Sequence, residues 1–216
     1  GAWKVRKDIN FDEKKITGKQ YVRRTYMLDQ DPIANNPNSI VATYINILGE
    51  LRNFFAALPL SEELSLGSRD FAIDKNFYQT NKKVEMVEHE GHDIYETLDM
   101  TVDEVYLIFR NNPLIERKLR FLRDLGLGYI VLNQKSATLS GGEAQRIKLA
   151  KILTKKLGDR CLYILDNPTK GLHLKNIRDV ADAFLRIVEK NNTVLIADNS
   201  EQILKRADYK LDLDKM

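Results

Sequence analysis

The middle of the chain repeats its apolar residues at the three-to-four-residue spacing of a helix. From residue 41 to residue 58 one apolar stripe carries Ile45, Leu48, Leu51, Phe54 and Phe55. Such a stripe is typical of an amphipathic helix that packs on a core. Pro59 then closes the helix, because a proline interrupts the hydrogen-bond ladder. The pattern therefore predicts one helix over Val41–Leu58.

Two start signals extend this helical region. Thr101 and Glu104 have the spacing of a capping box, and Pro113 has the fixed φ that suits a first helical position. The elements expected here are a small hairpin over Val84–Ile94 around Glu90-Gly91, a helix over Val102–Asn111 and a helix over Pro113–Leu125. Together they predict a small helical subdomain with one hairpin over residues 41–137.

Shorter apolar runs on both sides have the length and alternation of β-strands. Gln20–Leu28 alternates, and Leu162–Asp166 is four apolar residues that end on a carboxylate. The other expected elements are helices over Gly141–Leu157, Ile177–Val188 and Glu201–Lys205, and strands over Thr193–Ala197 and Ala207–Leu213. Strands alternating with helices predict an α/β fold, a parallel sheet with flanking helices.

This pattern divides the chain into a leader strand and loop at 1–40, the helical subdomain at 41–137 and an α/β part at 138–216. A chain of 216 residues with 43% hydrophobic and 30% charged residues is typical of one compact, soluble unit. It contains neither an apolar stretch of bilayer length nor a signal-peptide core. We therefore expect no membrane contact and a cytoplasmic location.

Candidate chemistry begins at the start of the helix expected from residue 141. Ser140 is placed to cap this helix, and Glu143 to reach back to Ser140. Gly141 and Gly142 lack side chains, so another backbone or a phosphate can approach their amides. The helix dipole favours an anion at the same place. The charged residues farther along this helix, Arg146, Lys148 and Lys151, are expected to lie mostly on its solvent side.

A second candidate lies one helix later, where Leu162–Asp166 ends. A carboxylate at the carboxyl end of a parallel strand is where a Mg²⁺–phosphate complex is usually held. Each motif alone also fits a purely structural role, as a helix cap or as a strand entering a turn. Their order and their distance together favour phosphate chemistry.

These residues carry a resemblance to a known family. Leu139–Glu143 resembles the signature motif of the ABC-type ATPases, and Leu162–Asp166 resembles their Walker B strand. The longer match, Leu139–Leu149 with Leu162–His173, is similar to the UvrA branch of that family, a component of the bacterial excinuclease; weaker similarity covers most of the chain. The resemblance implies the later part of one nucleotide-binding domain, in a DNA damage recognition context.

The resemblance also implies roles for single residues. It implies ATP contacts by Ser140, Gly141, Gly142 and Glu143, a Mg²⁺ held through the nucleotide by Asp166, and a Q-loop Mg²⁺ contact by Gln30. Gln30 equally fits a polar residue that leaves a strand before Pro32. Gly171–His173 is similar to the D-loop, which touches a facing domain.

The chain departs from the family pattern in three ways. No Gly-x-x-x-x-Gly-Lys-Ser/Thr P-loop is present, and the nearest fragment, Thr17–Gln20, lacks the leading glycine and the hydroxyl. Asn167 stands where the family has a catalytic Glu, although a turn residue before Pro168 fits equally well. Asn199 stands where the family has a switch His. We expect no ATP hydrolysis by the chain alone, which is either a split half or a gene product that never had a P-loop.

Other features of the sequence bear on whether the chain binds zinc, another metal or DNA. The family's zinc module, with paired Cys-x-x-Cys motifs, is missing, and the single Cys161 excludes a cysteine-built zinc site. His89 and His92 flank a turn without recognisable metal spacing. A net charge of +3 with interspersed acids permits weak DNA contact without indicating it.

Two hypotheses of different classes remain. In the first, the chain supplies signature and Walker B parts to ATP held by the P-loop of another half or of a UvrA-like protein. In the second, it is a non-catalytic interaction module that docks on such a partner. A P-loop encoded upstream of residue 1 would favour the first.

Overall fold

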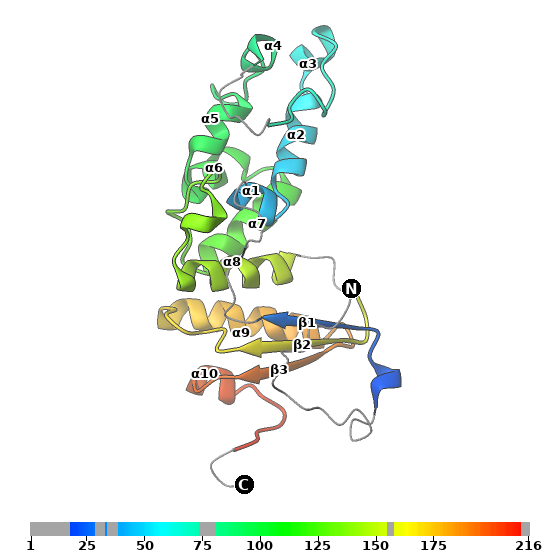
Figure 1. Cartoon of the computed structure of the whole chain (residues 1–216), viewed down its shortest axis with the longest axis vertical. Helices are drawn as coiled ribbons and strands as arrows, with labels where there is room; N and C mark the ends of the chain where they lie inside the picture. Colours follow the sequence, from blue (N-terminus) through cyan, green and yellow to red (C-terminus); the bar gives the residue numbers. More distant parts are fainter. Residues whose placement is uncertain (1–17, 29–32, 34–38, 74–80, 155–157, 213–216) are drawn as a thin grey trace.

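The computed structural model describes residues 18–28, 33, 39–73, 81–154 and 158–212 of the chain. A layer of helices stands on one side of a small sheet, and the helical region extends away from it (Figure 1). The sheet with its nearest helices is built from both ends of the sequence, whereas the distant helices come from its middle. This arrangement brings residues near 25 beside residues near 163.

The sheet is parallel, as predicted. Its strands are β1 (Arg24–Leu28), β2 (Cys161–Asp166) and β3 (Thr193–Ala197), in that order. The register pairs Tyr26 with Tyr163 and Tyr163 with Val194. β2 and β3 are joined by a crossover helix, because parallel neighbours cannot be linked by a tight turn.

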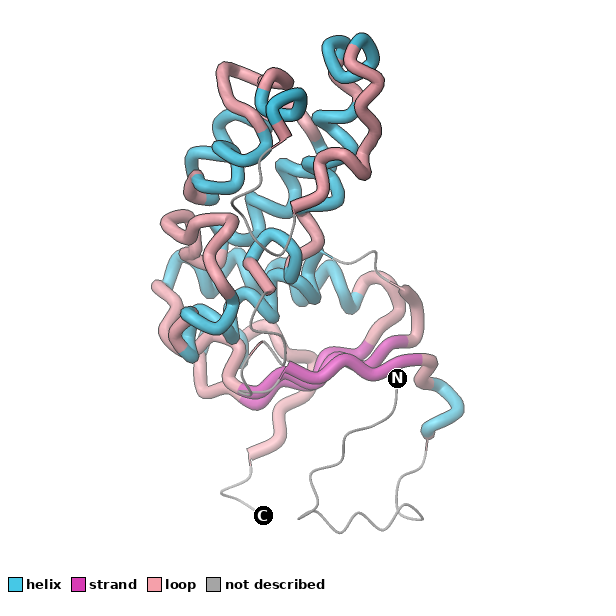
Figure 2. The backbone as a smooth tube through the Cα atoms, turned by 45° about the horizontal axis from the view of Figure 1, so that its top comes forward, coloured by secondary structure: helices cyan, strands magenta, loops and turns pink. Residues whose placement is uncertain are grey.

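One face of the sheet is covered by two helices. These are α8 (Gly141–Thr154) and α9 (Leu174–Val188), which lie on the same side of the strands in both views (Figures 1 and 2). Cys161, Tyr163 and Leu165 point to this side and are buried, and the Tyr26 ring stacks on Tyr163 with ring centroids 4.9 Å apart. The core beneath α8 and α9 therefore fixes the position of β2.

The opposite face of the sheet is apolar and open. Met27, Ile164 and Leu195 lie directly beside one another in the register, and they alternate with the residues buried under α8 and α9. Met27 is 64% exposed and Leu195 is 58% exposed. β3 also pairs with no second strand within the described residues. Parallel sheets are normally buried on both faces, but no helix or strand of the described part of the chain covers this one.

The helical region contains seven helices within the described residues. They are α1 (Val41–Tyr44), α2 (Leu48–Ala56), α3 (Pro59–Glu63), α4 (Lys82–Glu85), α5 (Ile94–Asp99), α6 (Val102–Phe109) and α7 (Pro113–Asp124). Their core includes Leu51, Phe55, Leu98, Val105, Phe109 and Leu119, all nearly inaccessible to solvent. None of the helices in the described part of the chain has the length and apolar character needed to cross a bilayer.

Both predicted start signals are present in this region. The Thr101 backbone N–H donates to Glu104 Oε2 over 2.8 Å, and the Glu104 N–H donates to Thr101 Oγ1 over 3.3 Å. Asn112 caps α7, and Pro113 is its first residue. The caps satisfy N–H groups that lack an acceptor inside the helix, so local sequence defines where α6 and α7 begin.

Two expectations for the helical region were wrong. The helix predicted over 41–58 is broken into α1 and α2, because Asn46 has a left-handed φ of 59°. Of the predicted hairpin, only the turn at Glu90-Gly91 and the bridge between His89 and His92 are present. Its flanks are helical, since Asn81 caps α4 and Asp93 caps α5.

Corrections also apply to the α/β part. The strand predicted over 207–213 is absent from its described residues, 207–212, which are exposed and irregular. α9 begins at Leu174, three residues before the expected start, and the short helix α10 (Glu201–Leu204) follows β3. The last three residues of the helix predicted over 141–157 lie outside the described residues.

In the turn that follows α7, Gly128 lies close to the side chain of Asp103. A Cβ at Gly128 would collide with the Asp103 carboxylate, which is paired with Arg123. We predict that Gly128→Ala lowers the free energy of unfolding by up to about 1 kcal/mol, because the Asp103 side chain must turn away and leave this exposed ion pair. Urea denaturation measures the effect.

Gly49→Ala is the matched control for this substitution. Gly49 lies in α2, and an added Cβ makes only an ordinary contact there. It is expected to stabilise the protein by about 0.5–1 kcal/mol, because alanine favours a helix more than glycine does. Equal effects of the two alanines would contradict the close approach at residue 128.

Candidate functional site

The first turn of α8 has the predicted capping box. The Ser140 N–H donates to Glu143 Oε2 over 2.8 Å, and the Glu143 N–H donates to Ser140 Oγ over 3.3 Å. Gly141 and Gly142 are exposed, and a Cβ at either position would meet nothing within 4 Å. Their amides have no acceptor inside the helix. These N–H groups can therefore donate to an anion that comes from solvent or from a facing surface.

Glu143 has an additional partner that the sequence did not predict. The Tyr129 hydroxyl donates to Glu143 Oε1 over 2.7 Å. Burial raises the pKa of the Glu143 carboxyl, but the hydrogen bonds from Tyr129 and Ser140 outweigh it, so this pKa lies below its usual value. The same bond raises the pKa of the Tyr129 phenol. Glu143 is therefore ionised at neutral pH.

The chain turns sharply after β2, at Asp166 and Asn167. Asn167 has a φ of 46°, a left-handed conformation that asparagine tolerates better than most residues. Its side-chain amide donates to Asp166 Oδ1 over 3.0 Å, and its backbone N–H donates to the Ala197 carbonyl over 2.7 Å. Asn167 thus closes a turn and contacts the Asp166 carboxylate.

α8 is tied directly to this turn. Gln145 is buried, and its Nε2 donates to the carbonyl oxygens of Asp166 at 2.8 Å and Asn167 at 3.1 Å. Arg146 Nη1 donates to the Gly171 carbonyl over 3.3 Å. The expectation that the charges of α8 lie mostly on the solvent side was wrong for Arg146 and also for Lys151, whose Nζ lies 3.8 Å from the Tyr44 ring centroid.

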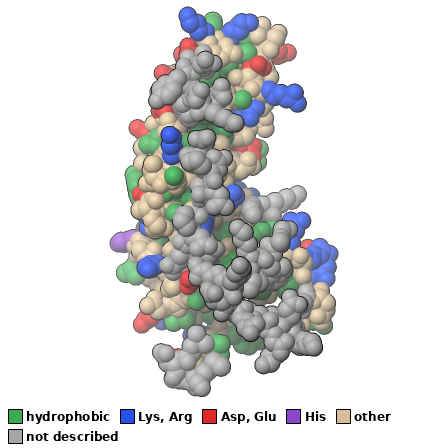
Figure 3. Space-filling model, viewed as in Figure 1, with side chains coloured by type: hydrophobic (Ala, Val, Ile, Leu, Met, Phe, Trp, Pro, Cys, Tyr) green, Lys and Arg blue, Asp and Glu red, His purple; other side chains and the backbone are tan. Residues whose placement is uncertain are grey.

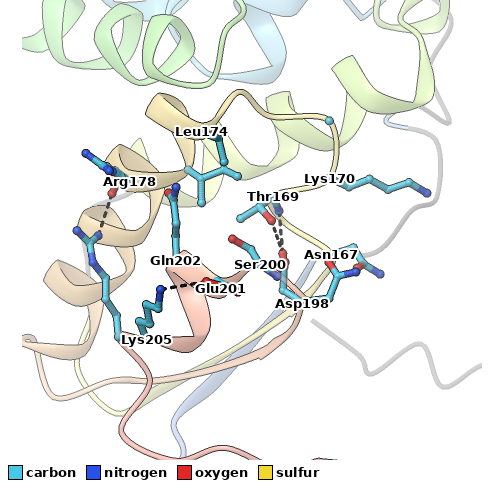
Figure 4. A pocket seen from close by; sticks show the side chains of 14 residues that line it. Asn167, Thr169, Lys170, Leu174, Arg178, Asp198, Ser200, Glu201, Gln202 and Lys205 are labelled. Atoms are coloured by element: carbon cyan, nitrogen blue, oxygen red, sulfur yellow. Dashed lines mark hydrogen bonds and ion pairs between the residues drawn. The ribbon is translucent and has the colours of Figure 1, made fainter.

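Asp198 joins the turn after β2 to the turn after β3. Its Oδ2 accepts from the Thr169 N–H at 3.1 Å and from Thr169 Oγ1 at 2.7 Å, while its Oδ1 accepts from the Ser200 N–H at 2.8 Å. The dashed lines between Thr169 and Asp198 show the first two bonds (Figure 4). Thr169 is buried, which makes this contact a fixed link between the two loops.

An open pocket of about 910 Å³ lies beside these loops. Asn167 and Asn199 both line it, so the structure brings the two altered positions to one place. In Figure 4 the side chains of Lys170 and Arg178 point away from the centre of the pocket rather than toward a common point. Two further basic residues line the pocket, Lys205 and Arg206, and they form ion pairs with Glu201 and Asp182.

The site fits only part of a Mg²⁺–ATP complex. Asp166 supplies one carboxylate at the carboxyl edge of the sheet, and Mg²⁺ in nucleotide sites usually takes one or two carboxylates with phosphate and water oxygens. The described residues contain no group of three or more His, Cys, Asp and Glu residues that could hold a metal. Gln30 lies outside the described residues.

Comparisons with known proteins give matches over most of the chain. A family model described as "ABC transporter" matches residues 8–170. UvrABC system protein A of Aquifex aeolicus is 37% identical over 93% of this chain and 25% of the relative, and that of Bacillus subtilis is 36% identical over 93% and 24%. The crystal structure of UvrA2 from Deinococcus radiodurans matches with a TM-score of 0.71 and 30% identity, covering 88% of this chain and 27% of that one. The chain spans about a quarter of these relatives' length.

Removing the Gln145 amide should destabilise the fold at this site. We predict that Gln145→Leu lowers the free energy of unfolding by about 1–3 kcal/mol, because two carbonyl oxygens lose a buried donor. The matched control is Gln202→Leu, since Gln202 Oε1 is buried without a partner among the described residues. Its stability should equal or exceed that of the wild type. Thermal denaturation of both variants compares them, and equal losses would contradict the bridging role.

Proposed function

The chain belongs to the ABC transporter family, and from this premise we propose that it is a UvrA-like ATPase portion that meets ATP held on another P-loop. Ser140, Gly141 and Gly142 would contact the nucleotide phosphates, and Asp166 would hold Mg²⁺ through the nucleotide. The partner is a P-loop-bearing half or a UvrA-like protein. The context is DNA damage recognition of the excision-repair kind.

The incomplete sheet is the observation that carries this proposal. Met27, Ile164 and Leu195 form an open apolar row, and β3 is an unpaired edge within the described residues. A P-loop is the turn between a strand and a helix. A P-loop strand paired with β3 would bring its turn to the carboxyl edge, near Asp166, and its helix would cover the open row. One partner element would complete both the fold and the phosphate site.

The proposed site hydrolyses ATP poorly. An amide at position 167 orients water but has no useful basicity, so general-base help of roughly 10²–10⁴-fold is lost. Asn199, at the switch position, lines the same pocket as Asn167. A closed complex with ATP should therefore persist, since closure in such a site is released by hydrolysis.

DNA contact in this proposal is weak and independent of sequence. The net charge is only +3, and on the face drawn in Figure 3 the Lys and Arg side chains are dispersed rather than gathered in one patch. Binding through scattered phosphate contacts falls steeply as salt rises. DNA recognition would therefore come mainly from the partner.

The second candidate function is a non-catalytic docking module. The left-handed backbone at Asn167 favours it, because asparagine suits this turn without any catalytic role. A docking module would use the same open sheet face to bind a partner, but its binding would not depend on nucleotide. Nucleotide dependence therefore separates the two candidates.

The signature turn provides the first test. Ser140→Ala removes a cap and costs about 1 kcal/mol of stability, so it should only weaken ATP-dependent association with a P-loop-bearing UvrA-like protein. A Cβ at Gly142 would meet nothing within 4 Å, so Gly142→Asp should cost the fold little. It places a carboxylate where phosphate would lie and should abolish that association. Analytical ultracentrifugation with and without Mg²⁺–ATP measures both. Equal losses for the two variants would favour the docking module.

The turn after β2 provides the second test. In the partnered mixture, Asn167→Glu should raise phosphate release and shorten the lifetime of the complex, although Asn199 limits the gain. Asn167→Gln is the matched control, because it has a similar length and the same backbone strain of about 1–2 kcal/mol without the basic carboxylate. The chain alone should stay inactive in every form. If Glu and Gln variants behave alike with the partner, the half-site proposal fails.

A further inference from the structure

The loop between α7 and α8 presents one side chain to the signature turn. We propose that Tyr129 is a positioning residue of this turn: its hydroxyl holds the Glu143 carboxylate in the capping box, so that the Gly141 and Gly142 amides stay open to phosphate. This inference rests on the proposed function. It adds a residue that lies outside the signature and Walker B motifs.

Tyr129 is held in place by its neighbours in the chain. Leu127 and Ile130 are buried on either side of it. The Ile130 N–H donates to the Leu127 carbonyl, and the Ile130 carbonyl accepts from the first residue of α6 over 2.9 Å. The carbonyl of the preceding residue, Gly128, accepts from the Asp103 N–H over 2.9 Å. The backbone of Tyr129 is therefore determined by packing, although its ring is 57% exposed.

Glu143 needs such a restraint because of its position. An ionised carboxylate in the first turn of a helix is attracted by the free amides and the positive end of the dipole. If it turned toward Gly141 and Gly142, it would occupy or repel the place of a phosphate. In the structure both oxygens are engaged elsewhere, Oε2 by the Ser140 N–H and Oε1 by the Tyr129 hydroxyl. Tyr129 therefore controls the second oxygen.

The first experiment does not depend on nucleotide. Carboxyl NMR titration of the full chain should show a higher Glu143 pKa in Tyr129→Phe than in the wild type, because a donor to the ionised form is lost. Tyr106→Phe is the matched control, since it removes another tyrosine–glutamate bond, to Glu116 over 3.4 Å, and should leave the Glu143 pKa unchanged. An unchanged Glu143 pKa and side-chain conformer in Tyr129→Phe would overturn the proposal, whatever the chain does with ATP.

The second experiment asks whether Tyr129 acts through Glu143. Tyr129→Phe should weaken ATP-dependent association with the P-loop partner by about three- to ten-fold, the range expected for one solvent-exposed hydrogen bond. In a Glu143→Gln background the same change should have little further effect, because no competing carboxylate remains. Equal losses in both backgrounds would overturn the positioning role. If the wild-type chain shows no ATP-dependent association, the proposed function is wrong. The carboxyl titration would then still test the role of Tyr129.

Discussion

The side-chain amide of Gln145 joins the two motifs on which the site depends. It comes from α8, whose first turn holds the open amides, and it binds the backbone where β2 ends. A buried amide that serves two carbonyl oxygens is costly to displace. The Gln145 amide therefore holds α8 in a fixed position relative to the backbone of Asp166 and Asn167.

The sequence predicted those features whose causes are local. The three strands in the parallel sheet and the caps at Thr101 and Ser140 follow from residues within a few positions of each other. The broken helix at Asn46 was not predicted, because its apolar stripe continues through the break and only the backbone angle reveals it. The expected strand over 207–213 failed since an alternating run forms a strand only where a neighbour pairs with it.

The side-chain contacts around the site could not be predicted from the sequence, because their partners lie far apart in the chain. Gln145 lies 21 residues from Asp166, and Tyr129 lies 14 residues from Glu143. Neither pair has a spacing that a helix or strand repeats, so only the folded arrangement shows the contact. The sequence carried no signal for Gln145, because its burial is a property of the folded chain. The division at 1–40, 41–137 and 138–216 stays a prediction, as do the roles of Gln30 and Asn199.

The open sheet face and the turn after β2 are connected if one partner element binds beside both of them. Apolar residues such as Met27 and Leu195 are exposed at a cost that burial under a partner would repay. Any element that binds only the folded chain stabilises it by mass action, so an added strand and helix would make stability depend on the partner. If that element carries the P-loop, nucleotide binding and folding stability become linked quantities. Under the proposed function, Asn167 in place of a catalytic carboxylate would leave this linkage intact and remove the hydrolytic step that releases the complex.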